Sequence, residues 1–324
     1  MNQNSNLLED TVVEDILRSI LVDYEIIFNK RINQDIRKEF LIDPKKNTCR
    51  FCKKSFPETT FKRKSHSIPE FMGNKTVISK YECDTCNELY FNLFENELSN
   101  FMQLFHTLSG IKGKKNKIPK YKLKGEPIIE HLPDIISISG ISETRINKKS
   151  KNCFEMPFKI PTYIPEYVYR CLVKICISLI PHNNLPIYQG TIDWLMNLNQ
   201  KPSIKPYMIF TTYPNKCQIP EVFAVLLARK DNCDKNIPHS IFFLSYDSYA
   251  FQTYLPYSSK EKLNVDLKVF PYEIPTMIDL NPENRKLKES CVIDLSSINK
   301  IKNENITVTV IGDLIEREIK NPKR

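Results

Sequence analysis

Glycine is scarce in this sequence, and long apolar runs are missing from it. The 324 residues include seven Gly, and neither GxGxxG nor GxxxxGK[ST] occurs, so Gly-rich phosphate-binding loops of nucleotide-hydrolysing enzymes are excluded. No run of 18 apolar residues exists, and the N-terminus is polar and acidic. Because a membrane span needs about 20 apolar residues and a secretory signal needs an apolar segment, we expect neither and predict a cytoplasmic protein without membrane contact.

Positive charge is concentrated in one segment. Hydrophobic residues make up 41% of the chain and charged residues 26%, which is typical of globular proteins, and the length of 324 residues allows two or three domains. Residues 43–125 contain 17 Lys and Arg against eight acids, and this excess of nine equals the excess of the whole chain. Such a segment is typical of a domain that faces a polyanion. Charge alone leaves open the alternative of a Lys-rich solvated surface.

Apolar periodicity predicts four helices. Apolar residues recur at three- and four-residue steps over 7–30 and over about 84–108, and both patterns favour helices. Another helix is expected from Pro165 to a stop before Pro181, and a short one is expected around Trp194. Residues 109–127, with three Gly, two Pro and seven Lys, have no hydrophobic period and indicate a basic connector.

From about residue 126 onward, the composition and the apolar pattern predict a separate α+β domain. Apolar runs rich in β-branched and aromatic residues, separated by Pro, Asn and Asp turns, predict strands in this region. We expect these strands at 207–213, 222–229, 240–247, 249–255, 266–270, 291–295 and 306–311.

Four of the ten cysteines are arranged in two close pairs. Cys49-x2-Cys52 and Cys83-x2-Cys86 are separated by 30 residues. In a reducing compartment, paired C-x2-C knuckles indicate a tetrahedral thiolate site, most often structural Zn²⁺. The other six cysteines are scattered singly, and we interpret them as small apolar fillers.

The residues around these pairs resemble the HNH endonucleases. That family has a zinc-stapled ββα-metal fold with C-x2-C, then [D/E]-H-x-x-P, a Gly-Gly or Gly-Asn turn, and C-x2-C-N. The matching stretches here are CRFC (49–52), SHSIPEFMGN (65–74) and ECDTCNELYFNLFENEL (82–98). The resemblance covers about 60 residues and says nothing about the C-terminal two hundred.

The resemblance implies a role for each matching residue. His66 would be the general base that takes a proton from the attacking water. Asn87 would bind a catalytic Mg²⁺ or Mn²⁺ ion, with Glu95 as a second ligand or orienting group. The imidazole of His66 and the carboxamide of Asn87 should then converge on one hydrolytic pocket. The acid that usually precedes the catalytic His is Ser65 in this sequence, and a hydroxyl is a poor ligand for a hard dication.

Basic side chains near the motifs are candidates for contacts with phosphate groups. A solvated linker is an equally good interpretation of the lysines between 112 and 124. The candidate nucleic-acid ligands are Lys62, Arg63, Lys64, Lys114 and Lys115.

Two functions fit this sequence. The first is a metal-dependent HNH endonuclease that hydrolyses DNA phosphodiester bonds, controlled by its C-terminal domain, by a protein partner or by oligomerisation; such architectures in prokaryotes often serve restriction or anti-phage defence. The alternative, favoured by Ser65, is an inactive zinc-binding adaptor for nucleic acid or protein. The predicted α+β chain has an N-terminal helical segment (1–42), an HNH domain (43–108), a basic linker (109–127) and an α+β domain (128–324).

Overall fold

The computed structural model of the chain describes residues 3–32, 37–45, 47–113, 116–214, 217–233, 235–262 and 272–313. Helices and sheets both contribute, so the predicted α+β class is confirmed. Among the described residues, no helix combines the length and the apolar character that crossing a bilayer needs.

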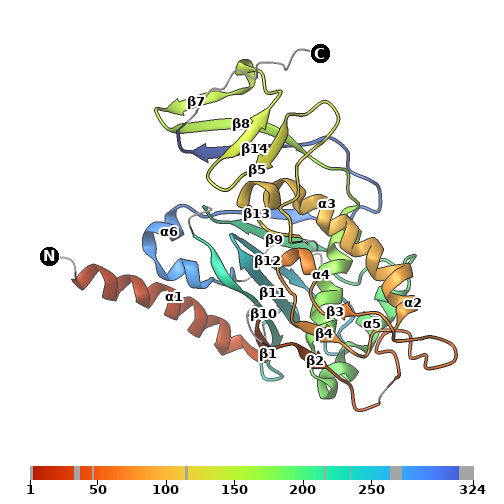
Figure 1. Ribbon diagram of the computed structural model, residues 1–324. Helices are drawn as coiled ribbons and strands as arrows, with labels where there is room; N and C mark the ends of the chain where they lie inside the picture. The colour runs from red at the N-terminus through yellow and green to blue at the C-terminus, as the bar shows by residue number, and fades with distance from the viewer. Residues whose placement is uncertain are drawn as a thin grey trace, which may run out of the picture.

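A six-stranded antiparallel sheet lies at the centre of the molecule (Figure 1). Its strand order is β1 (Tyr24–Ile32), β10 (Ile219–Arg229), β11 (Ser240–Asp247), β12 (Tyr249–Tyr254), β9 (Tyr207–Thr212) and β13 (Glu289–Asp294). Side chains of β10 alternate between two cores: Ala224 and Leu226 face one, and Val225 and Leu227 face the other. Because both faces are buried, the inner strands are continuous apolar runs, which explains why the sequence predicted them.

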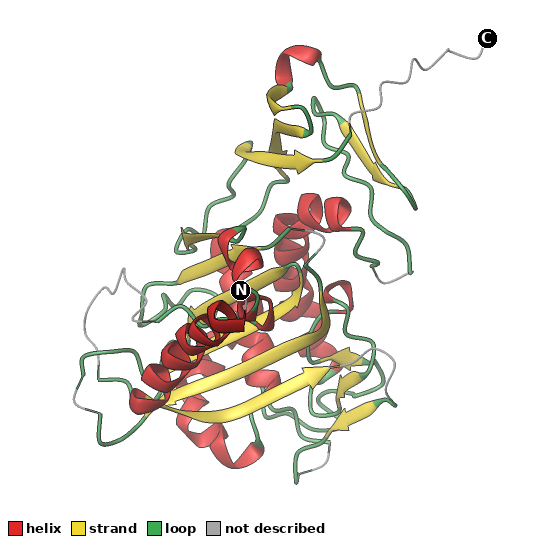
Figure 2. Ribbon diagram, turned by 90° about the vertical axis from the view of Figure 1, so that its left-hand side faces the viewer, coloured by secondary structure: helices red, strands yellow, loops and turns green. Residues whose placement is uncertain are grey.

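Helices cover both faces of this sheet. Helix α1 (Gln3–Asp23) crosses one face, as Figure 2 shows, and α4 (Pro165–Leu179) and α5 (Gln189–Met196) lie on the other. Every residue of α4 except Tyr167 is buried. Cys171 and Cys176 of α4 are therefore apolar fillers as expected, whereas Cys291 on β13 is exposed and fills no core. A short helix α6 (Pro282–Lys286) and 3₁₀ turns at His182–Tyr188 and Met277–Leu280 complete this part, whereas a 3₁₀ turn at Glu143–Arg145 belongs to the smaller β layer described below.

The predicted helix over 7–30 is wrong in its last turns. Helix α1 ends at Asp23, and residues from Tyr24 onward form β1, which pairs with β10 from Tyr24 opposite Arg229 to Ile32 opposite Val222. The apolar residues of 24–30 fit a helical period by spacing alone. Their β-branched and aromatic side chains suit a strand, and the pairing with β10 decides between the two structures.

The segment with the two cysteine pairs forms a compact ββα unit. Strand β3 (Ser65–His66) pairs antiparallel with β4 (Val77–Ser79), and β2 (Glu39–Leu41) runs parallel to β4 on its other side. A helical segment follows, composed of α2 (Asp84–Cys86), a π turn (Asn87–Phe91) and α3 (Asn92–Ser109). The predicted helix over 84–108 is thus confirmed, and it ends at Gly110, whose left-handed backbone (φ 73°) is typical of helix C-termini.

A smaller β layer packs on the far end of α3 (Figure 1). It contains β14 (Glu304–Ile311), β8 (Cys153–Ile160) and β7 (Asn147–Ser150) in one sheet, and β5 (Ile128–His131) with β6 (Ile136–Ser139) in another. Its core includes Leu104 and Leu108 of α3. Strand β14 was predicted, but β5 to β8 were not, and the predicted strand 266–270 lies outside the described residues.

The predicted basic connector is anchored rather than loose. Tyr121, in the middle of residues 109–127, is fully buried and forms a β-bridge with Ile129. Its hydroxyl donates a hydrogen bond to the backbone oxygen of Lys159 at 2.7 Å. The lysines of this segment that the structure describes are exposed to solvent, whereas Tyr121 is buried.

The ββα unit and the central sheet share one hydrophobic core through α4. Arg50, between the first two cysteines, donates from Nη1 to the backbone oxygens of Ile177 at 2.7 Å and Ile180 at 3.0 Å. Its Nε donates to Asp43 Oδ2 at 3.0 Å. The guanidinium thus satisfies carbonyl groups at the C-terminus of α4 that have no partner within the helix. The division of the chain at residues 43, 109 and 128 stays a prediction.

A buried histidine of α3 makes stability depend on pH. His106 Nε2 lies 2.8 Å from the Tyr246 hydroxyl, and burial lowers the pKa of His106 from 6.5 to about 3. The unfolded chain therefore binds a proton that the folded chain does not, so this contribution is complete above pH 6.5 and is lost as pH falls toward 3. We expect the unfolding free energy to fall about 2 kcal/mol more between pH 6.5 and pH 5 in the wild type than in His106→Gln. Urea denaturation at both pH values measures this difference; equal changes in the two proteins would contradict it.

Candidate functional site

The four paired cysteines meet at one point. Their sulfur atoms lie within 4.8 Å of one another. The Sγ atoms of Cys49 and Cys86 are 3.8 Å apart, and those of Cys52 and Cys83 are 3.7 Å apart. A tetrahedron with Zn–S bonds of about 2.3 Å has sulfur–sulfur edges of about 3.8 Å. The predicted Cys₄ set is therefore assembled, and its dimensions fit a zinc ion.

Local backbone structure positions these sulfur atoms. Lys53 has a left-handed backbone (φ 62°) and its amide donates to the Cys49 oxygen at 3.0 Å, which closes the first knuckle. Cys83 precedes α2, and its Sγ accepts from the Cys86 amide at 3.4 Å. Contacts with Cys49 lower the pKa of the Cys83 thiol, whereas contacts with Cys49 and Cys83 raise the pKa of Cys86. Four thiolates at this spacing repel one another, and a bound dication would offset that repulsion.

His66 is oriented by an acid on the next turn of the chain. Its Nε2 lies 3.0 Å from Glu70 Oε1, and 14% of its side chain is exposed. Glu70 begins a 3₁₀ turn (Glu70–Met72) that ends at Gly73, where a left-handed φ of 92° lets the chain reverse. The pairing of His66 with Glu70 was not predicted from the sequence.

Asn74 fixes the reversal that separates β3 from β4. Its Nδ2 donates to the backbone oxygens of Ile68 at 2.8 Å and Val77 at 3.0 Å. Its Oδ1 accepts from the amides of Thr76 at 3.1 Å and Val77 at 2.9 Å. All hydrogen-bonding capacity of this buried carboxamide is used by the turn, so Asn74 holds the two strands in register.

Asn87 lies against Ser65. Asn87 is the first residue of the π turn, a feature that often marks functional sites. Its Nδ2 donates to Ser65 Oγ at 3.0 Å and to Glu82 Oε1 at 2.8 Å. Glu82 is buried, and sequence reasoning did not assign it a role. Its place directly before Cys83 is the only sequence signal that could have drawn attention to it.

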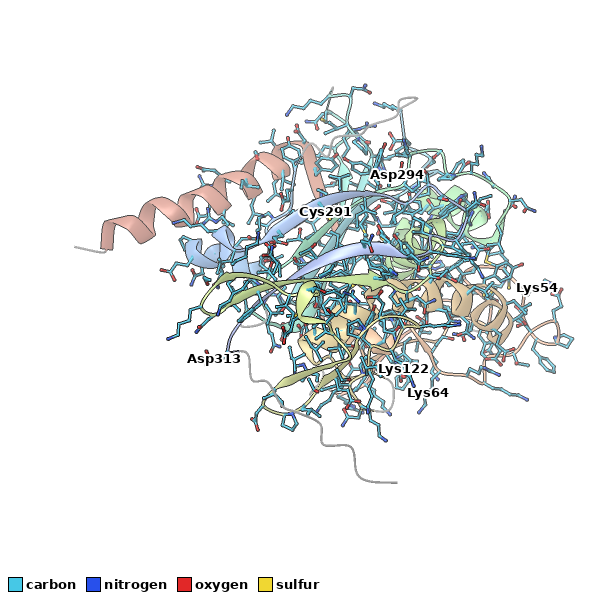
Figure 3. All side chains as sticks on the ribbon, turned by 90° about the horizontal axis from the view of Figure 1, so that it is seen from above. Lys54, Lys64, Lys122, Cys291, Asp294 and Asp313 are labelled. Carbon is cyan, nitrogen blue, oxygen red and sulfur yellow. The ribbon has the colours of Figure 1, made fainter. Side chains whose placement is uncertain are left out.

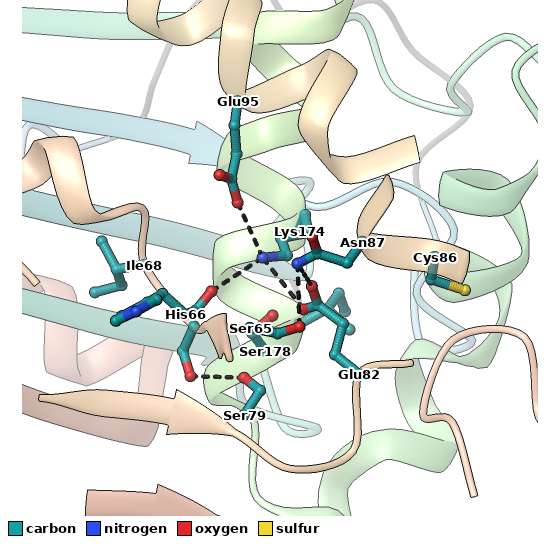
Figure 4. A network of polar contacts seen from close by, with 12 residues as sticks. Ser65, His66, Ile68, Ser79, Glu82, Cys86, Asn87, Glu95, Lys174 and Ser178 are labelled. Carbon is teal, nitrogen blue, oxygen red and sulfur yellow. Dashed lines mark hydrogen bonds and ion pairs between the residues drawn. The ribbon is translucent and has the colours of Figure 1, made fainter. Parts of the chain in front are cut away.

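A lysine from α4 projects into the same cluster (Figure 4). The Lys174 ammonium lies 3.3 Å from Glu82 Oε2 and 3.4 Å from Glu95 Oε1. It also donates to the His66 backbone oxygen at 3.1 Å, and 1% of its side chain is exposed. Burial acts to lower the pKa of Lys174, but the carboxylates of Glu82 and Glu95 outweigh it and raise the pKa above its usual range. Sequence reasoning missed Lys174, although a lysine in the apolar second half of α4 is a visible signal.

The predicted site residues therefore meet around an ammonium group. Glu95 and Asn87 lie on two sides of Lys174, and His66 contributes its backbone oxygen (Figure 4). Figure 4 also shows the imidazole of His66 pointing away from Asn87. The expected convergence of that imidazole with the carboxamide on one pocket is not the arrangement observed.

The predicted nucleic-acid ligands that the structure describes lie beside β3. Lys62, Arg63 and Lys64 are exposed; Lys64, like Lys54, projects from the surface in Figure 3. The backbone amides of Lys62 and Arg63 donate to the Asp84 carboxylate at 3.0 and 2.9 Å, which fixes this stretch to the start of α2. Arg63 also pairs with Glu88. Lys114 and Lys115 lie outside the described residues.

Residues 49–102 match a family described as HNH endonuclease. The matched segment contains both cysteine pairs, β3, β4 and the first half of α3. The resemblance inferred from the motifs is thus confirmed for this segment. No curated protein and no solved structure matches the chain.

Replacing one cysteine of the Cys₄ set tests the metal assignment. We expect Cys83→Ser to lose its zinc and to unfold the ββα unit, because structural zinc contributes on the order of 10 kcal/mol to folding. Zinc content by mass spectrometry and far-UV circular dichroism measure the two effects. The control is Cys291→Ser, which removes an exposed thiol outside the site and should retain both zinc and fold. Unchanged zinc content in Cys83→Ser would disprove the assignment.

Proposed function

We propose that the HNH endonuclease domain at residues 49–102 hydrolyses DNA phosphodiester bonds, with His66 as its general base. The supporting observation is the pairing of His66 Nε2 with Glu70 at 3.0 Å on the strand of the ββα unit that carries the H-x-x-P motif. A carboxylate beside an imidazole orients the ring and stabilises the imidazolium that forms when it accepts a proton. His66 would take the proton from water, whose oxygen then bonds to phosphorus as the bond to the leaving oxygen breaks.

Exposed cations beside β3 support binding to a nucleic-acid backbone. Lys62, Arg63 and Lys64 lead directly into the strand that carries His66. Contacts of this kind neutralise phosphate groups and give little sequence preference. We further propose a cytoplasmic role in prokaryotic restriction or defence, with control by a partner or by the C-terminal part of the chain; this role follows from the family resemblance.

The zinc site and the predicted catalytic ion differ in how well the chain fits them. The Cys₄ set fits zinc, which would staple the ββα unit and hold β3 near the helix. The Mg²⁺ or Mn²⁺ expected at Asn87 and Glu95 does not fit the observed arrangement. Glu95 faces the Lys174 ammonium, and Asn87 directs its Nδ2 group, a hydrogen-bond donor, into the cluster. No step of the proposed reaction therefore depends on that ion.

A second candidate function is a zinc-binding adaptor without catalytic activity. Two observations in the same cluster favour it. Ser65 replaces the usual acid, and an ammonium lies among the groups expected to bind the catalytic ion. Such a protein would keep the ββα scaffold and its basic surface for binding nucleic acid or protein.

Plasmid nicking in Mg²⁺ or Mn²⁺ distinguishes the two functions. We expect the wild type to nick the plasmid and His66→Ala to be slower by about 10²- to 10⁴-fold, the usual contribution of a general base. The control is His182→Ala, which removes a half-exposed histidine away from β3 and should keep the wild-type rate. Zinc content and circular dichroism must be unchanged in both variants. Equal nicking by wild type and His66→Ala, or none by any variant in either metal, would refute the nuclease proposal, and the second result would favour the adaptor.

A further inference from the structure

The Lys174 ammonium is surrounded by oxygen atoms from three separate elements. His66 of β3 contributes a backbone oxygen at 3.1 Å, Glu82 of the segment before α2 contributes a carboxylate at 3.3 Å, and Glu95 of α3 contributes another at 3.4 Å. The ammonium donates hydrogen bonds to His66 O and Glu95 Oε1, and it forms an ion pair with Glu82 Oε2. Two carboxylates around one ammonium leave the cluster with a formal charge of −1.

These oxygen atoms are also the hard donors that a dication would need in this part of the site. Glu95 and Asn87 are the expected ligands of the ion. The Glu82 carboxylate connects them, because it accepts a hydrogen bond from the Asn87 amide and pairs with Lys174, which also pairs with Glu95. A Mg²⁺ ion requires oxygen atoms at about 2.0–2.1 Å in near-octahedral geometry. An ammonium 3.3–3.4 Å from the same carboxylates occupies that space and would repel the ion across a few ångströms.

A simple buried ion pair between α4 and the ββα unit is the plainer explanation of Lys174. An ion pair of that kind would explain why Lys174 has an acidic partner. It would not explain why Lys174 has two acidic partners, nor why one of them, Glu82, also binds the Asn87 amide. The Asn87 carboxamide, Ser65 hydroxyl and Glu82 carboxylate form a chain of contacts that continues to the ammonium. The lysine thus completes the polar network of the site itself.

We propose that Lys174 is the built-in cation of the HNH site and that it excludes a divalent ion from Glu82 and Glu95. The inference rests on the HNH assignment of residues 49–102 but not on catalysis, since it concerns metal occupancy. The site then requires residues from two parts of the chain, because the cation comes from α4 and the acids come from the ββα unit.

The exclusion is a fixed property of the fold rather than a switch. Helix α4 is buried along nearly its whole length between the sheet and the ββα unit. Arg50 binds the backbone oxygens of Ile177 and Ile180 at the end of α4, three residues and six residues beyond Lys174. The ammonium cannot leave the cluster without separating these packed elements.

A titration of the zinc-loaded full chain with Mn²⁺ tests this proposal, with bound Mn²⁺ measured by electron paramagnetic resonance. We expect the wild type to bind no Mn²⁺ at this site at concentrations on the order of 1 mM, the weak end of protein sites for hard cations. Lys174→Met has nearly the same volume without the charge and should bind one Mn²⁺ at least about tenfold more tightly, because the repulsion is gone. The double variant Lys174→Met/Glu82→Gln should lose that binding.

Two results would overturn the proposal. The first is wild-type binding of one Mn²⁺ that is weakened in Glu95→Gln, and this measurement does not depend on whether the Lys174 variant folds. The second is a folded, zinc-loaded Lys174→Met protein that binds Mn²⁺ no better than the wild type. Failure of plasmid nicking would refute the proposed nuclease function but would leave the manganese result unaffected, so the two failures are distinguishable.

Discussion

The burial of one charged group among two acids constrains the rest of this structure. Lys174 is fully enclosed, so its ammonium is tolerated only because Glu82 and Glu95 lie beside it. Those acids stay in place only while the cysteine knuckles and α3 are docked against α4. The Cys₄ set, the candidate catalytic residues and the central sheet are therefore mutually dependent, although their sequences are separate stretches of the chain.

Local signals predicted the parts of the site that are close in sequence. The two C-x2-C pairs predicted the Cys₄ set, and the apolar period predicted the helix from Asp84 onward, because both patterns report on neighbouring residues. The position of His66 on a strand followed from the motif. The fold class and most strands of the central sheet were also predictable, since strands buried on both faces are continuous apolar runs.

The features that the sequence did not predict depend mainly on contacts between residues that are distant in the chain. Residues 24–30 fit a helical period, and only pairing with β10 makes them a strand. Strands β5, β6 and β7 have four residues each and are mostly half-exposed or exposed, so their apolar pattern is weak. Strand β8 alternates buried and more exposed side chains, but Pro157 interrupts it. Lys174 had no recognisable motif, because its role depends on acids contributed by other elements of the folded chain. The orientation of the His66 imidazole depends on Glu70 and was likewise not encoded in motif spacing.

The packing of α3 determines when this protein can acquire its site during synthesis. Phe101 and Phe105 of α3 pack edge to face against Phe210 of β9, with ring centroids 5.5 and 5.1 Å from that of Phe210. On the ribosome, the histidine and the cysteine pairs emerge well before Phe210, and Lys174 emerges between them. A nascent chain therefore exposes the apolar side of α3 until the sheet strands follow. The cluster of Lys174 with Glu82 and Glu95 can therefore form only after α4 has been made and has docked against the ββα unit.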